Sequence, residues 1–134
     1  MPDRFALAAA FLAAFTVASG ALAQPSSPLD RCYGEAKRRL DVGPCLAKLL
    51  DQAEAKLEDA LALAKRDARE LDAVIGPRAR NMEKLAASHE AWSRYREAEC
   101  ARRAEAMSPG TGSGDVQLAC LVELTERRAA ELPM

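Results

Sequence analysis

One long apolar stripe constrains the fold of this chain more than any other feature. Between residues 46 and 71, Leu and Ala recur at steps of three and four residues, which places them on one face of a helix. The stripe consists of Leu46, Leu49, Leu50, Ala53, Leu57, Leu61, Ala64, Ala68 and Leu71. Most of the intervening positions are charged and are interpreted as a solvated face. We expect this helix to begin near Cys45 and to stop at Gly76-Pro77, since Gly suits a helix C-terminus and Pro opens the next segment.

Three further helices are expected around this one. Their predicted ranges are 30–40, 78–106 and 115–132. Asp30 and Asp115 are the expected N-caps, and residues 41–44 (DVGP) are expected to break the first helix. β-Branched residues are rare after residue 24, and Leu and Ala dominate the apolar positions. The predicted fold class is therefore all-α: a small antiparallel bundle of two long and two shorter helices.

All four cysteines, Cys32, Cys45, Cys100 and Cys120, lie within the predicted helical region. An even number of cysteines in a small exported domain indicates two disulfides, and four cysteines allow three pairings. The sequence separations favour Cys32–Cys45 and Cys100–Cys120, which close two local loops. A zinc site is not favoured, because the chain has no C-x-x-C pair and its single histidine is remote in sequence.

The N-terminus has the three parts of a secretory signal. Arg4 supplies a positive charge, residues 5–17 form an unbroken apolar run, and Ala21-Leu22-Ala23 matches an A-x-A cleavage site. The apolar run is shorter than the roughly 20 residues of a membrane span. We therefore expect residues 1–23 to be a signal peptide, with cleavage near Ala23-Gln24. Residues 24–29 are expected to be a flexible linker and residues 30–134 the helical domain, located in the periplasm or secreted without a stable membrane anchor.

The segment between the two last predicted helices is the first candidate for function. Cys100 and Cys120 flank it on either side. A stapled, protruding loop costs less to order on binding, although the loop taken alone is more simply interpreted as a plain connector between antiparallel helices. The candidate partner-binding loop consists of Ser108, Pro109, Gly110, Thr111, Gly112, Ser113, Gly114 and Asp115.

No residues in the chain form a recognisable catalytic, metal or cofactor motif. His89 is the only histidine, and it falls on an apolar stripe between Leu85 and Trp92, which favours a packed or boundary position. The carboxylates are scattered on predicted exposed faces, which does not suit glycoside hydrolysis. The net charge is −1 and no basic patch with interleaved aromatics is present, which argues against nucleic-acid binding. We therefore expect a protein that is not an enzyme and that has no cofactor.

The second half of the chain resembles a known family. Leu85, His89, Trp92, Tyr95, Arg96 and Cys100 follow the pattern L-x-x-x-H-x-x-W-x-x-Y-R-x-x-x-C. After the Gly/Ser loop, Cys120, Leu124, Thr125, Arg128 and Leu132 follow C-x-x-x-L-T-x-x-R-x-x-x-L. Together these resemble the LprI-type lysozyme-inhibitor N-terminal domain family, over roughly residues 32–132. The Cys45-Leu46 pair also looks like the family's entry into its first long helix.

The resemblance implies an exported helical protein and a set of framework positions. These are Leu85, Trp92, Tyr95, Arg96, Leu124, Thr125 and Arg128. Thr125 suits a hydrogen bond back to a helix carbonyl, and Arg128 suits an ion pair with a carboxylate across the helix seam. His89 stands where the family usually has Gln, and Glu97 where it often has Asp. No inhibitory residues are carried over.

The leading hypothesis is a lysozyme inhibitor that binds a muramidase through a protein–protein interface. The net charge gives little electrostatic steering toward a basic lysozyme, so any attraction must be local, for which Asp115, Glu123 and Glu126 are candidates. The alternative is a periplasmic structural or adaptor module with an unrelated partner, because a fold does not fix a function. A weaker third hypothesis is a small-ligand site between the helices.

Overall fold

The structure is a computed structural model that describes residues 26–132. In this range it has four α-helices and one short 3-10 helix: α1 (Pro28–Glu35), η1 (Arg39–Asp41), α2 (Val42–Ile75), α3 (Asn81–Glu105) and α4 (Ser113–Glu131). The predicted all-α fold class is confirmed. The predicted signal peptide and the first part of the predicted linker lie outside the described residues. The end of that linker differs from expectation, because Pro28 and Leu29 already belong to α1.

The boundaries of the first helix are set differently from the prediction. Ser27, not Asp30, is the N-cap of α1, and its Oγ accepts the Asp30 backbone N–H at 3.1 Å. The helix also ends earlier, at Glu35, and the stretch expected to complete it holds η1 instead. Residues 41–44 do not break a helix but begin one. Pro44 lies in the first turn of α2, where a backbone N–H has no intrahelical partner to lose.

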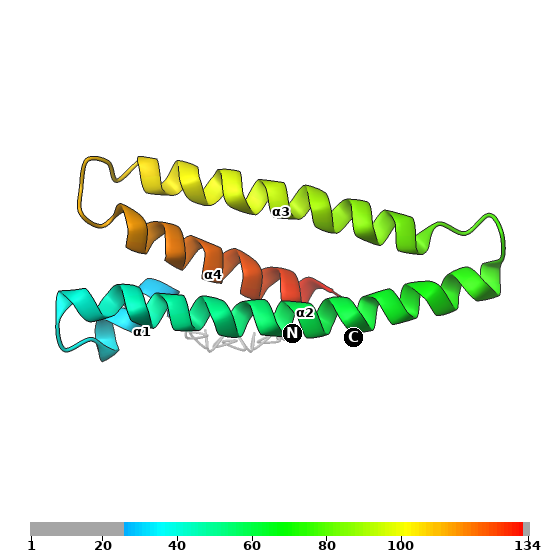
Figure 1. Cartoon of the computed structure of the whole chain (residues 1–134), viewed down its shortest axis with the longest axis horizontal. Coiled ribbons are helices and arrows are strands. Elements are labelled where there is room, and N and C mark those ends of the chain that lie inside the picture. Colours follow the sequence, from blue (N-terminus) through cyan, green and yellow to red (C-terminus); the bar gives the residue numbers. More distant parts are fainter. Residues whose placement is uncertain (1–25, 133–134) are drawn as a thin grey trace, which may run out of the picture.

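Successive long helices run antiparallel, so α2 and α4 run in the same direction, and α4 lies between α2 and α3 (Figure 1). Their lengths differ greatly: α2 has 34 residues, α3 has 25 and α4 has 19. At 1.5 Å per residue these correspond to about 51, 38 and 28 Å. Because α4 starts at the end where the α3–α4 loop lies, it runs out before the α2–α3 turn (Figure 1). Among residues 26–132, the far part of α2 and α3 is therefore a two-helix arm that α4 does not reach.

The α2–α3 turn is closed by glycine and by one aspartate. α2 ends at Ile75 as predicted, and Gly76 adopts a φ of 91°, a conformation that glycine takes without strain. Asp72, near the end of α2, accepts the backbone N–H groups of Asn81 at 2.8 Å and Met82 at 3.1 Å. These are N–H groups of the first turn of α3, which have no partner within their own helix. One carboxylate thus caps α3 from the preceding helix.

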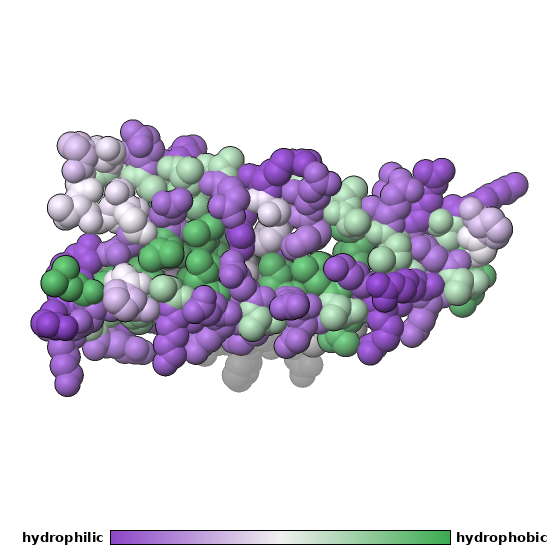
Figure 2. Space-filling model, viewed as in Figure 1, coloured by the Kyte–Doolittle hydropathy of each residue, from purple (hydrophilic) through white to green (hydrophobic). Residues whose placement is uncertain are grey.

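The core is built mainly by α2 and α4. Buried residues of α2 follow the predicted stripe at Leu46, Ala53, Leu57, Leu61 and Ala64. The sequence predicted a weaker apolar face for the last helix, but α4 is the most enclosed of the three long helices because it is covered on two sides. Its buried residues are Ala119, Cys120, Val122, Leu124 and Thr125. By contrast, α3 fully buries only Cys100. Figure 2 shows the hydrophobic residues gathered along the cleft between the helices, bordered by hydrophilic ones.

Two disulfides link the helices in the pairing that the sequence separations favoured. Cys32–Cys45 joins α1 to α2, and Cys100–Cys120 joins α3 to α4. Cys32 and Cys100 are fully buried. Closing loops of 13 and 20 residues stabilises the folded state by about 3 kcal/mol each in the chain-entropy description.

Candidate functional site

The loop between α3 and α4 protrudes at one end of the bundle (Figure 1). Residues 106–111 are all exposed. Gly110 makes the turn tight, because its N–H donates to the Met107 carbonyl oxygen at 2.8 Å. A Cβ at Gly110 would lie 2.7 Å from that same oxygen, closer than side chains tolerate. The central part of the predicted loop, residues 108–112, is thus a compact exposed turn that requires glycine at one position.

The last three residues of the predicted loop belong to a helix instead. α4 begins at Ser113, and its N-cap position is Gly112, so Asp115 is not the N-cap. The Asp115 side chain is largely buried and forms an ion pair with Arg39 of η1. This pair connects the start of α4 to the α1–α2 connection, a contact that no local sequence pattern predicts. Gly112 already has helical backbone angles, and no side chain caps the start of α4.

Charged side chains close the base of the loop beside the second disulfide. Glu99 accepts hydrogen bonds from Arg102 at 2.8 Å and from Arg103 at 2.9 Å. Arg103 also reaches Glu123 of α4 at 3.1 Å, so the network crosses from α3 to α4. The hydrogen bonds from Arg102 and Arg103 lower the pKa of Glu99 to about 2. The base of the loop is therefore held by a covalent and an ionic link.

The three acidic residues proposed to attract a basic partner are all engaged within the molecule. Asp115 pairs with Arg39, and Glu123 pairs with both Arg103 and Arg127. Glu126 of α4 pairs with Arg31 of α1 at 3.1 Å. Their charges are neutralised locally, so they provide little attraction for a basic protein. Shape and apolar contacts must therefore contribute more to any interface at this end.

Most framework residues of the family pattern lie at contacts between the helices. Arg96 donates a hydrogen bond to the Thr125 hydroxyl at 3.0 Å, and Thr125 is fully buried. The Trp92 ring packs against the apolar cluster of Leu57, Leu61, Ala64 and Leu132. Leu85 lies against the same cluster, and Leu124 belongs to the cluster around the second disulfide. These contacts join α3 to α2 and α4.

Two of the framework contacts differ from those expected. Arg128 does not pair with a carboxylate across the seam; it donates to the Ser88 hydroxyl of α3 at 3.1 Å and approaches Glu131 of its own helix at 3.8 Å. Thr125 serves as an acceptor for Arg96 from the neighbouring helix. Tyr95 is largely exposed. It lies on the outer face of α3, because the inward positions of that stretch are Trp92 and Arg96.

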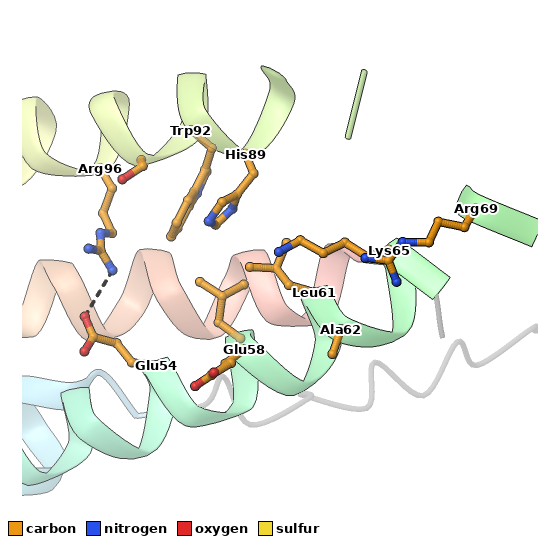
Figure 3. A pocket seen from close by; sticks show the side chains of 11 residues that line it. Glu54, Glu58, Leu61, Ala62, Lys65, Arg69, His89, Trp92 and Arg96 are labelled. Atoms are coloured by element: carbon orange, nitrogen blue, oxygen red, sulfur yellow. Dashed lines mark hydrogen bonds and ion pairs between the residues drawn. The ribbon is translucent and has the colours of Figure 1, made fainter. Parts of the chain in front are cut away.

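A groove of about 440 Å³ opens between α2 and α3 beside Trp92 (Figure 3). His89 stacks on the Trp92 ring with the ring centres 5.4 Å apart. The Arg96 guanidinium lies 5.2 Å from the centre of the same ring. Lys65 and Arg69 of α2 line the groove near His89, whereas Glu54 and Glu58 line its other end. Sequence reasoning placed His89, Trp92 and Arg96 on one face but missed their partners from α2, because only tertiary packing pairs the two helices.

The surroundings of His89 lower the pKa of its imidazole. Partial burial lowers its pKa below 6.5, and the positive charges of Arg128, Lys65 and Arg96 lower it further. No carboxylate or nucleophile of the described chain is hydrogen-bonded to its ring. The geometry is that of a boundary histidine in a packed cluster, which agrees with the packed or boundary position predicted for it.

Within residues 26–132, no cluster of three or more His, Cys, Asp or Glu side chains is arranged to hold a metal ion. None of the helices in this part of the chain is both long and apolar enough to cross a membrane.

Comparison with known proteins identifies the family. Neither the curated proteins nor the solved structures contain a match to this chain. A family model described as lysozyme inhibitor LprI matches residues 29–132, which spans the bundle from the second residue of α1 to the end of α4. The match includes both disulfides, the framework residues and the α3–α4 loop. This chain therefore belongs to the LprI lysozyme inhibitor family.

Proposed function

We propose that this protein is an exported inhibitor of a muramidase, which it blocks by binding and without chemistry of its own. The family match over the whole described bundle is the observation that carries the proposal. The site geometry agrees with it, because the packed side chains around Trp92 form structural hydrogen bonds and ion pairs. The bundle also has a protruding loop whose base is held by a disulfide, a feature that suits binding to another protein rather than catalysis.

Export is part of this proposal. The N-terminal sequence has the charge, apolar run and A-x-A site of a signal peptide, with cleavage expected near Ala23-Gln24. All four cysteines of the chain pair into disulfides, which suits an oxidising compartment. We place the mature protein in the periplasm or outside the cell, without a stable membrane anchor.

The α3–α4 loop is the proposed point of contact. It is exposed, compact and closed at its base by Cys100–Cys120 and by the Glu99–Arg103–Glu123 network. A rigid segment loses little conformational entropy when it enters a cleft, and this loss is a principal cost of association. The loop therefore has the properties required of an inhibitory element.

The test is a titration of a basic lysozyme with purified residues 24–134 in a cell-wall lysis assay. We expect lysis to fall as the protein approaches the concentration of the enzyme. In the control, the cell walls are incubated with the protein and washed before lysozyme is added, which separates binding to the enzyme from shielding of the wall. Undiminished lysis at micromolar protein would exclude inhibition of that lysozyme class.

A second candidate function is an adaptor for an unrelated envelope protein. The two-helix arm favours it, because Leu71, Val74 and Ile75 near its tip are exposed. Exposed apolar side chains that lie together often mark a binding surface. A pull-down from envelope extract would support this function if it recovered one envelope protein and no muramidase, and if Val74→Asp removed that protein.

A further inference from the structure

Two connections that are distant in sequence form one end of the bundle. The α1–α2 connection with η1 and the α3–α4 loop lie at the same end (Figure 1). The Arg39–Asp115 ion pair joins them, and a hollow of about 400 Å³ lies between Leu40, Thr111 and the atoms of this pair. We call this region, residues 33–41 together with residues 105–115, the loop end.

The loop end is held in one shape by several independent links. Cys32–Cys45 fixes η1 to α1 and α2, and Cys100–Cys120 fixes the α3–α4 loop. Within η1, the Asp41 carboxylate accepts the Arg38 backbone N–H at 3.1 Å and pairs with the Arg38 side chain at 2.8 Å. The Arg39–Asp115 pair then connects the two halves. A surface fixed in this way is already organised for binding.

This fixed surface exposes large apolar side chains. Leu40 is 81% exposed, Met107 is 51% exposed and Tyr33 is 48% exposed. Figure 2 shows hydrophobic surface at this end of the molecule, over the α1–α2 connection. The folded chain gains nothing from an apolar side chain that stays in water, whereas its burial in a partner is favourable.

We propose that the whole loop end, and not the α3–α4 loop alone, is the surface that seats in the muramidase, with Leu40 and Met107 as its apolar anchors. This inference rests on the proposed function and specifies its interface. A convex, rigid end fits a concave cleft, and the ion-paired acids at this end leave apolar contact as the main source of affinity. The Arg39–Asp115 pair acts as a positioning contact that keeps Leu40 in register with the loop.

Charge distinguishes the loop end from the opposite tip of the molecule. The tip also exposes apolar residues, including Val74, but residues 65–84 carry six Lys or Arg and four Asp or Glu. Residues 33–41 and 105–115 together carry three Lys or Arg and four Asp or Glu. A basic lysozyme is repelled by the tip and not by the loop end. The loop end is therefore the better match for such a partner.

The test compares Leu40→Asp with Val74→Asp in the mature chain. The two residues are 81% and 85% exposed, so neither substitution disturbs the core. We expect Leu40→Asp to weaken lysozyme inhibition by about 30-fold or more, the effect of removing an interface anchor, and Val74→Asp to change it by less than about 3-fold. Equal effects of the two variants, or a loss confined to Val74→Asp, would overturn the assignment of the loop end.

A charge reversal tests the positioning contact. Arg39→Asp and Asp115→Arg each place like charges together and are expected to weaken inhibition, whereas the double variant restores the pair and most of the inhibition. Failure of the double variant to recover, with its helical content by circular dichroism unchanged, would contradict the positioning role. If the unmodified protein inhibits no muramidase, the proposed function is wrong, and this inference is wrong with it. If the unmodified protein inhibits but Leu40→Asp has no effect, the proposed function is retained and the assigned surface is wrong.

Discussion

Arg96 of α3 donates a hydrogen bond to the buried hydroxyl of Thr125 in α4, at 3.0 Å. The same guanidinium pairs with Glu97 at 2.8 Å and reaches Glu54 of α2 at 3.4 Å. Arg96 therefore connects all three long helices. Its side chain is only 15% exposed, and such a partly desolvated cation depends on its partners.

Replacing Thr125 by Val tests this contact, because Val keeps the shape of the side chain and removes the acceptor. We expect the free energy of unfolding to fall by about 1–2 kcal/mol, the usual cost of losing one hydrogen bond from a charged group, while Arg96 keeps its pairs with Glu97 and Glu54. Urea denaturation followed by circular dichroism measures it. Thr125→Ser is the matched control, since it keeps the hydroxyl and should retain the contact. A Val variant as stable as wild type would show that the bond contributes nothing net.

The two disulfides are predicted to differ in their local effect but not in their contribution to stability. Removing either pair, as Cys32→Ala with Cys45→Ala or Cys100→Ala with Cys120→Ala, should cost about 3 kcal/mol. Only loss of Cys100–Cys120 should increase amide hydrogen exchange in residues 106–112, since that bond closes the base of this loop. Unchanged exchange in the loop would mean that the ionic network alone holds its base.

We predict that the stabilising effect of Asp72 on the α2–α3 turn is lost in acid. Hydrogen bonds from the backbone N–H groups of Met82 and Asn81 lower its pKa below 3.8, against a smaller opposing effect of burial. Its contribution is therefore present above pH 3.8 and is lost as the pH falls through the lower pKa of the folded state. Asp72→Ala should lower the melting temperature at pH 7, and the difference from wild type should shrink toward pH 2.

The control for that experiment is Asp67→Ala. Asp67 lies on α2 one turn before Asp72, and its ion pair is a 3.7 Å contact with the adjacent Arg66. We expect this substitution to leave the melting temperature unchanged at both pH values. A loss equal to that of Asp72→Ala would point to a general charge effect in place of helix capping.

His89 is predicted to make the protein less stable in mild acid. Its pKa is lowered in the folded state, first by burial and then by Arg128, Lys65 and Arg96. Below pH 6.5 the unfolded chain takes up a proton that the folded chain resists, so stability falls from pH 6.5 toward the lowered pKa. His89→Gln should remove this fall. Unfolding free energies at pH 5 and pH 7.5, with an NMR titration of the imidazole, measure it; an imidazole pKa at or above 6.5 would contradict the prediction.

The sequence by itself determined the helical architecture and the disulfides. The stripe from Leu46 to Leu71 has a period that only a helix buries on one face, and Gly76-Pro77 ends that helix where expected. The spacing of the cysteines favoured the pairing that the structure shows. The spacing of Trp92, Arg96 and Cys100 likewise indicated one face of a helix, because such local periodicity depends only on the helix itself.

The helix starts were harder to predict, since several residues compete for each cap. Ser27 and Asp30 are both good caps, and the structure uses the serine oxygen for the backbone and keeps the aspartate inside the first turn. Asp115 has the same chemistry, but Arg39 engages it. The local sequence shows which residues could cap a helix. It does not show whether a residue far away in the chain binds the same side chain instead.

Only the tertiary structure decided which side chains are enclosed and which remain exposed as possible binding surfaces. α4 has a weak apolar pattern and yet is the most enclosed long helix, because it lies between α2 and α3 (Figure 1). Its shorter length leaves the far part of α2 and α3 as a two-helix arm (Figure 1). The loop end arises because Arg39 and Asp115, 76 positions apart, meet in space. Sequence periodicity fixes the face that each helix buries, but the packing of whole helices against one another decides which distant segments become neighbours.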